Sequence, residues 1–249
     1  MARQSGFRGI EIDPNELRMN GMPRYSGTEF GMLKHQFFAN TVRDLGVISR
    51  TRLGEELLDL IAKRHDGTGT PGGVAGRTVT IIFRPPTNPG ASAAAMGLND
   101  RFGVNKTVGG REMRFAGPGS SSKIRMHNSG LESEQIFTNL CGVQTPVYIA
   151  LAHELIHSLH HLSGTSYREE VQAPGGAVKR EEMFTTGLGP YANTRLSENA
   201  LRREVGLPER THYTFPDDHM HMPSLVALNA QRRPGYWYCA CLQEQFGDL

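Results

Sequence analysis

The segment that most constrains the fold is residues 146–163, which are apolar over much of their length. Its hydrophobic residues fall on most sides of a helical repeat, which predicts a helix buried inside a core. Thr145 and Pro146 fit an N-cap followed by proline at the first helical position, and Gly164 is expected to end the helix.

Three ionisable side chains interrupt this apolar segment: His153, Glu154 and His157. A buried polar group costs free energy unless it has a partner. The two histidines are one helical turn apart on the same face, where two imidazoles can bind one zinc ion. Glu154 can then reach a water beside the metal and act as a general base. The alternative is a surface helix with incidental histidines, and the apolar surroundings argue against it.

His160 extends the same helix and needs its own interpretation. The metzincin pattern requires glycine at position 160 and histidine at position 163, whereas this chain has His160 and Ser163. That class of metalloprotease is therefore excluded. We expect His160 to pack near the metal ligands or to orient them, without binding the ion.

A third ligand has to come from a later segment. Glu181 and Glu182 begin a short segment with helical character about 25 residues after His157. A connection of this length allows the chain to turn back and bring a carboxylate to the metal. Neighbouring helical residues point about 100° apart, so only one of the pair can bind directly while the other holds a histidine. The other downstream candidates are Glu169, Glu170, Glu198, Asp217, Asp218, His219 and His221.

The rest of the chain predicts an α+β fold with a small twisted sheet packed on the buried helix. Hydrophobic spacing predicts helices over residues 29–47 and 51–64, and a β-branched run predicts a buried strand over 78–83. Residues 85–121 are rich in glycine and proline, so we expect a long surface excursion with short strands. Residues 123–126 alternate polar and apolar side chains, which favours an edge strand.

Composition excludes several classes of protein. A net charge of +2 over 249 residues argues against a nucleic-acid binder. No apolar run approaches the ~18 residues of a membrane-spanning helix, and the N-terminus lacks the apolar core of a secretory peptide. The 3 cysteines form no Cys-x-x-Cys pair, so reduced thiols are expected. We expect residues 1–28 to form a loose arm with a strand near 7–12, and residues 29–249 to form a single domain.

The motifs together resemble those of clostridial neurotoxin light chains. The histidine motif and its continuation to Gly164 resemble their active helix, and residues 181–187 resemble their second zinc motif. This resemblance implies that Glu182 is the third zinc ligand and that Glu181 lies behind it.

A further motif of the light chains has a counterpart at residues 210–213. Arg-Thr-His-Tyr is similar to their Arg-x-x-Tyr, which implies that Arg210 and Tyr213 face the scissile carbonyl and stabilise the transition state. The alternative is a surface arginine and a core tyrosine.

Over residues 140–215 the chain resembles the NleD-type effectors, which are zinc metalloproteases that bacterial pathogens inject through type III secretion. Residues 181–189 and 197–208 carry this resemblance together with the helix motif. It implies a zincin-like metalloprotease domain and host protein substrates such as mitogen-activated protein kinases. It also implies passage from the bacterial cytoplasm into the host cytoplasm, with a secretion signal in residues 1–28. We expect a monomer that binds neither nucleic acid nor membranes.

Two other functions stay open at this point. One is a zinc hydrolase that acts on a bond other than a peptide bond. The other is a catalytically inactive zinc protein that binds a host kinase, in which His160 or Asp218 would supply a fourth protein ligand. Glu154 argues against the second, because a structural zinc site needs no base and is closed by four protein ligands.

Overall fold

The structure is a computed structural model in which the helices and strands form an α+β fold. Two compact units are distinguished by their internal contacts: residues 1–135 with 146–167, and residues 136–145 with 168–249. The single-domain expectation stays a prediction. The structure describes residues 3–14, 27–83, 94–126, 136–138, 144–173 and 176–211.

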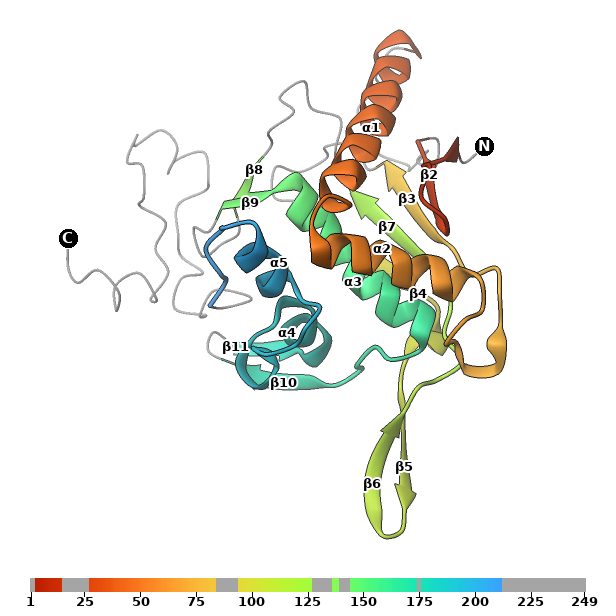
Figure 1. Ribbon diagram of the computed structural model, residues 1–249, viewed down its shortest axis with the longest axis vertical. Helices are drawn as coiled ribbons and strands as arrows, with labels where there is room; N and C mark the ends of the chain where they lie inside the picture. Colours follow the sequence, from red (N-terminus) through yellow and green to blue (C-terminus); the bar gives the residue numbers. More distant parts are fainter. Residues whose placement is uncertain are drawn as a thin grey trace, which may run out of the picture. The chain divides into compact units, whose positions relative to one another are not determined.

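A mixed five-stranded sheet forms one layer of the first unit (Figure 1). Its strands, in the order in which they lie side by side, are β1 (Arg3–Gln4), β2 (Ile10–Asp13), β3 (Val79–Phe83), β7 (Ser122–Met126) and β4 (Ala94–Gly97). The three inner strands run parallel to one another, whereas β1 and β4 are antiparallel to their neighbours. The central strand β3 is β-branched and buried, as a strand covered on both faces must be.

The position of β7 corrects one prediction. The structure places this strand between β3 and β4, so it is an interior strand and the edge belongs to β4. The sequence misled because β4 consists of small residues, Ala-Ala-Met-Gly, which lack the β-branched signature of a strand.

Three helices complete the first unit, and all agree with the predicted segments. Helix α3 (Val147–Ser163) packs on β4 and β7 and also contacts the other two helices, so it lies between the sheet and an outer helical layer. Nearly every residue of α3 is buried, as its sequence predicted. The helices are α1 (Gly27–Ile48), α2 (Arg52–His65) and α3 (Val147–Ser163).

The two ends of α3 differ in how well the sequence predicted them. Gly164 ends the helix at a φ of 66°, and a Cβ there would lie 2.3 Å from the carbonyl oxygen of Gly117. Only glycine fits that position. The N-cap prediction is wrong, because Pro146 occupies the cap and the Thr145 hydroxyl accepts a hydrogen bond from the Arg202 guanidinium.

The excursion predicted over residues 85–121 contains a β-hairpin that projects from the unit (Figure 1). Gly109 and Gly110 both have positive φ values, 58° and 76°, as a tight two-residue hairpin turn requires. The hairpin strands are β5 (Val104–Val108) and β6 (Arg111–Phe115), and they follow the 3-10 turn η2 (Asn99–Arg101). A further 3-10 turn is η1 (Pro71–Gly73).

The second unit is built from short elements. A small core of Val178, Met183 and Leu188 packs with Val171 and Tyr191. Gly187, at a φ of 83°, ends the first of its helices. The elements are β8 (Ile136–Thr138), β9 (Gln144–Pro146), β10 (Glu170–Ala173), β11 (Gly176–Lys179), α4 (Arg180–Thr186), η3 (Gly189–Tyr191) and α5 (Glu198–Glu204).

The N-terminal arm contributes to the sheet. The strand expected near residues 7–12 is found at 10–13, and residues 3–4 pair with it. Residues 15–26 lie outside the described part of the chain. Among the helices that are described, none combines the length and hydropathy needed to cross a membrane.

Candidate metal centre

The centre begins with two histidines on α3. His153 and His157 are 7% and 6% exposed, and their Nε2 atoms lie 3.1 Å apart. Their rings meet edge to face, with centroids 4.7 Å apart. Two nitrogens that each bind one tetrahedral zinc ion at about 2.0–2.1 Å would be roughly 3.3 Å apart. The spacing of the two imidazoles therefore fits a shared ion.

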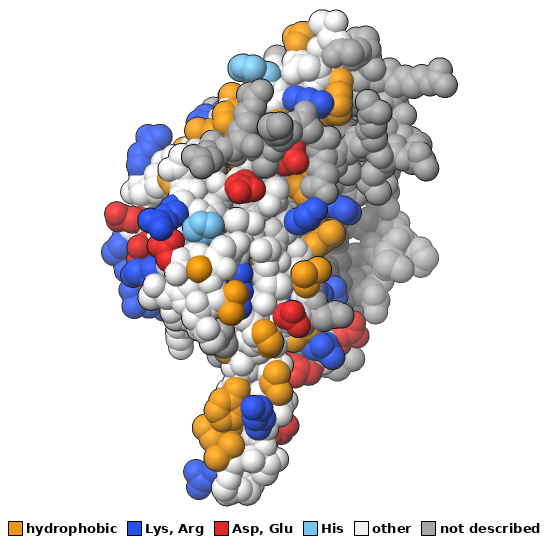
Figure 2. Space-filling model, turned by 90° about the vertical axis from the view of Figure 1, so that its right-hand side faces the viewer, with side chains coloured by type: hydrophobic (Ala, Val, Ile, Leu, Met, Phe, Trp, Pro, Cys, Tyr) orange, Lys and Arg blue, Asp and Glu red, His pale blue; other side chains and the backbone are white. Residues whose placement is uncertain are grey.

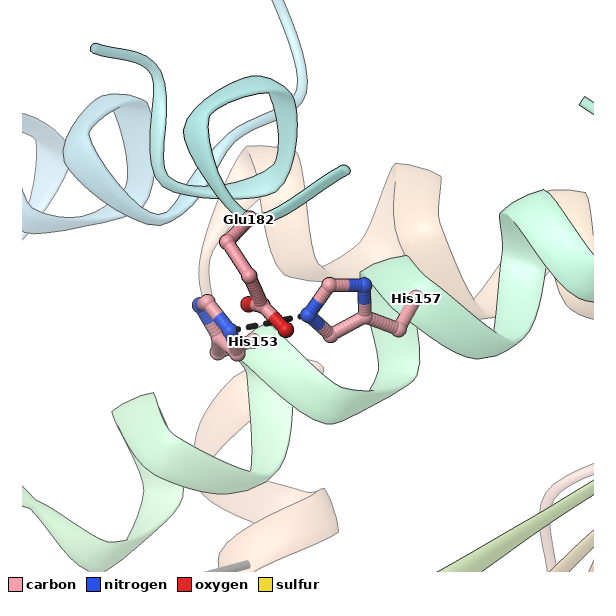
Figure 3. A group of neighbouring side chains, drawn as sticks. All are labelled: His153, His157 and Glu182. Carbon is pink, nitrogen blue, oxygen red and sulfur yellow. Dashed lines mark hydrogen bonds between the residues drawn. The ribbon is translucent and has the colours of Figure 1, made fainter. Parts of the chain in front are cut away.

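Glu182, in the first turn of α4, completes a set of three possible ligands. Its carboxylate oxygen and the ring nitrogens of His153 and His157 all lie within 4.8 Å of one another. In Figure 3 the carboxylate of Glu182 is directed at both rings. Two imidazoles and one carboxylate are the donor set of a catalytic zinc site with a position left for water. The chemistry of the residues present thus fits zinc.

Glu181 and His160 form a second close group with His157. The ring nitrogens of the two histidines and a carboxylate oxygen of Glu181 lie within 4.8 Å of one another. Thr185 Oγ1 also donates a hydrogen bond to Glu181 Oε1 at 3.4 Å. The role predicted for Glu181 and His160, to hold the ligands from behind, stays a prediction.

Glu154 is buried, and its carboxylate lies against the edge strand β4. The backbone N–H of Ala95 donates a hydrogen bond to Glu154 Oε2 at 2.6 Å. Sequence reasoning missed this donor, because a backbone N–H within a short alanine run carries no side-chain signal. The contact fixes the carboxylate of a residue that directly follows His153 on α3.

Ser158 and His161 lie on the same side of α3 as Glu154, and a buried polar cluster ties this side to the sheet. Ser122 Oγ lies 3.0 Å from Ser158 Oγ and 2.8 Å from His161 Nδ1. Gly97 on β4 leaves room for this imidazole, since a Cβ there would lie 2.8 Å from His161 Cγ. These contacts fix the rotation of α3, and therefore the direction in which the neighbouring stripe presents its histidines.

The C-terminal end of α3 is held by two arginines. Arg77 Nη1 donates to the carbonyl oxygen of Leu162 at 2.8 Å, and Arg64 Nε donates to Ser163 Oγ at 2.9 Å. Burial lowers the pKa of Arg77, and the carboxylate of Asp100 partly opposes that shift. A buried cation suits this place because the last carbonyls of a helix carry partial negative charge.

Arg210, predicted to face the scissile carbonyl, lies in a network within the second unit. Its Nη1 atom is 2.9 Å from Glu198 Oε2, and Arg202 Nε is 2.7 Å from Glu198 Oε1. The side chain of Asn199 bonds both the N–H and the C=O of Arg210, each at 2.8 Å. The carboxylate of Glu198 is therefore engaged by two guanidinium groups.

The remaining candidates divide into two sets. Among the described residues, Glu169, Glu170 and Glu198 belong to no group of three side chains close enough to share an ion. The others lie outside the described residues: Tyr213, Asp217, Asp218, His219 and His221.

A buried helix that carries His-Glu-x-x-His, with a carboxylate from a later helix, is the residue arrangement of a His-Glu-x-x-His zinc site. The profile of the Peptidase M91 family, described as effector protein, matches residues 31–213. The chain belongs to this family. The NleD-type effector family identified from the motifs is thereby confirmed.

Solved structures of botulinum neurotoxin light chains are similar to this chain. The type D light chain is 18% identical, with a TM-score of 0.47 over 72% of this chain and 54% of that one. The serotype F light chain of Clostridium botulinum is 18% identical, with a TM-score of 0.41 over 73% and 55%. The serotype HA light chain is 15% identical, with a TM-score of 0.48 over 75% and 54%. The chain thus spans about half the length of these proteins. No curated protein matched it.

Proposed function

We propose that the chain is a zinc-dependent endopeptidase. The observation that carries this proposal is the group formed by His153, His157 and Glu182, together with Glu154, which directly follows His153 on α3. Three protein ligands leave one position for water, which is the arrangement of catalytic rather than structural zinc sites. A carboxylate directly after the first histidine is in the position from which a general base can take a proton from that water.

The roles of the residues follow from their chemistry. Bound zinc would supply Lewis acidity for the attacking water and the peptide carbonyl. His153, His157 and Glu182 would hold the ion. Glu154 accepts the proton of the attacking water and later donates it to the leaving amine. The N–H of Ala95 keeps the Glu154 carboxylate in place for both transfers.

Arg210 and Tyr213 are proposed to stabilise the oxygen of the scissile carbonyl. The ion pair with Glu198 and the bonds to Asn199 hold Arg210 in one position. A donor that is already held requires no reorganisation when charge develops on the oxygen.

The proposed substrates are host signalling proteins, reached through type III secretion. The effector family supports delivery to a host, and the resemblance to NleD-type effectors supports mitogen-activated protein kinases as substrates. The bond that is cut is proposed to be a peptide bond in one of these host proteins.

The test compares the wild-type chain with Glu154→Gln. Each is incubated with host-cell lysate and with purified mitogen-activated protein kinases, and new protein N-termini are labelled and identified by mass spectrometry. Wild type should generate new N-termini, and the variant should bind zinc but cleave about 10²–10⁴-fold more slowly. Cleavage by Glu154→Gln at the wild-type rate, or zinc-loaded wild type without any cleavage, would contradict the proposal.

A further inference from the structure

The β5–β6 hairpin has two chemically different faces. The pairing places Val104 opposite Phe115, Lys106 opposite Met113 and Val108 opposite Arg111. Directly opposed residues share a face, so these six side chains form one surface, which we call the hairpin face. The opposite side of the hairpin carries Asn105, Thr107, Glu112 and Arg114.

The hairpin face is exposed although most of it is apolar. Figure 2 shows hydrophobic side chains gathered along one side of the projecting hairpin at the lower end of the molecule. Apolar groups that stand together on a surface mark interaction sites, whereas single exposed ones are ordinary. The exposed fractions are 42% for Val104, 49% for Val108, 47% for Met113 and 39% for Phe115.

The opposite side of the hairpin is fixed to the first unit. Arg114 Nη2 donates to the carbonyl oxygen of Ser166 at 2.6 Å, and the Arg114 guanidinium lies 4.0 Å from the centre of the Tyr167 ring. The N–H of Gly103 donates to the same Ser166 carbonyl at 3.1 Å. Because its polar side is anchored at the base, the hairpin presents its apolar side outward.

Charge on the hairpin face indicates what it can bind. Lys106 and Arg111 are its two ionisable residues, so the face has positive charge and no acidic side chain. Lys106 Nζ lies 5.8 Å from the centre of the Phe115 ring, which places a cation beside apolar surface. A second copy of the chain would bring like charges together. Insertion of the hairpin into a membrane is also disfavoured, because its tip, Gly109 and Gly110 followed by Arg111, has no apolar side chain to insert.

We propose that the hairpin face binds an extended segment of the protein substrate in which apolar and acidic residues alternate along one side. Residues two apart on a strand share a side and are about 6.6 Å apart, which matches the order Val104, Lys106, Val108. Outside the hairpin, Met96 on β4 and Leu98 just after that strand are also exposed, by 41% and 68%, and Ala95 on the same strand donates to Glu154. The inference rests on the proposed function, because the partner is the substrate.

The test measures binding without cleavage, in the 249-residue chain carrying Glu154→Gln. The probe is a fluorescein-labelled peptide of three Leu-Ser-Glu-Ser repeats, and the comparison peptide has lysine in place of glutamate. Fluorescence anisotropy should show saturable binding of the acidic peptide that weakens with salt. The double substitution Val108→Ser with Met113→Ser should raise its Kd by about tenfold or more.

Two further variants control for the position and the charge of the surface. Asn105→Ala with Thr107→Ala changes the other side of the same hairpin and should leave the Kd within about twofold. Lys106→Ser with Arg111→Ser should weaken binding of the acidic peptide and abolish its preference over the basic one. Thermal unfolding of each variant confirms that it is folded.

Several results would overturn the inference. These are equal binding of the two peptides, no change in the Val108→Ser with Met113→Ser variant, or equal loss in the variant of the opposite side. The surface would be assigned to another partner if the chain bound phosphatidylserine vesicles, or formed a dimer in sedimentation, and Val108→Ser with Met113→Ser abolished that interaction. If the wild-type chain cleaves proteins in lysate but the Glu154→Gln chain does not bind the acidic peptide, only the proposal for the hairpin face fails. If the peptide binds but no protein is cleaved, only the proposed endopeptidase activity fails.

Discussion

At the scale of single residues, the adjacent carboxylates Glu181 and Glu182 have different environments. Glu181 is buried and accepts a hydrogen bond from Thr185, while Glu182 is half-buried and close to both His153 and His157. The two differ in direction because successive helical residues are rotated by about 100°. A direct ligand and a supporting residue should therefore respond differently to the same substitution.

Replacing Glu182 by Ala should lower zinc affinity more than 100-fold, because a direct ligand is removed. Glu181→Ala is the matched control in the same helical turn, and it should lower affinity by about 10–100-fold, as loss of a supporting carboxylate does. Competition with a chelating dye, with bound zinc measured by mass spectrometry, gives both values. Equal affinities in the two variants would void the assignment, and a larger loss at position 181 would reverse it.

At the scale of elements, the edge strand β4 could not be predicted from the sequence. Hydrophobic periodicity predicted α1, α2, β3 and α3, since each has a face or a whole surface to bury. β4 and the hairpin have small or exposed side chains, so no periodic signal marks them. The interior position of β7 depends on β4 as a partner, and for that reason the sequence alone assigned it to the edge.

The contact between β4 and Glu154 predicts a specific kinetic defect. Ala95→Pro removes the N–H that donates a hydrogen bond to Glu154 Oε2, and β4 is an edge strand, where proline is tolerated. A hydrogen bond to a charged group contributes about 1.5–3 kcal/mol, so kcat should fall about 10–150-fold with zinc content unchanged. Ala95→Ser keeps the N–H and should retain near wild-type kcat. Equal rates for the proline and serine variants would refute the role of this donor.

The anchoring of α3 by Arg77 predicts a loss of stability. Arg77→Met leaves the carbonyls of Leu162 and Pro118 without their buried donor, which should lower the free energy of unfolding by about 2–4 kcal/mol. Arg8→Met removes an exposed ion pair with Asp66 and should cost under about 1 kcal/mol. Urea unfolding followed by circular dichroism measures both. A loss for Arg77→Met no larger than that for Arg8→Met would show that the anchor is unimportant.

At the scale of the whole molecule, the proposed ligands come from segments far apart in the sequence. The spacing of His153 and His157 is local, and the helical repeat alone predicted that they meet. Glu182 follows the β10–β11 hairpin, and residue spacing left several carboxylates open until the resemblance selected one. Tyr213 stays a prediction because it lies outside the described residues. The Peptidase M91 profile covers residues 31–213 and therefore includes both segments.

X-ray absorption at the zinc edge of the zinc-loaded chain tests the central claim most directly. The account predicts one zinc with two imidazole nitrogens at about 2.0–2.1 Å, the remaining ligands being oxygens at about 2.0–2.2 Å. The imidazole signal should be lost in a His153→Ala, His157→Ala double variant. Sulfur at about 2.3 Å from one of the 3 cysteines, or an unchanged spectrum in that variant, would contradict it.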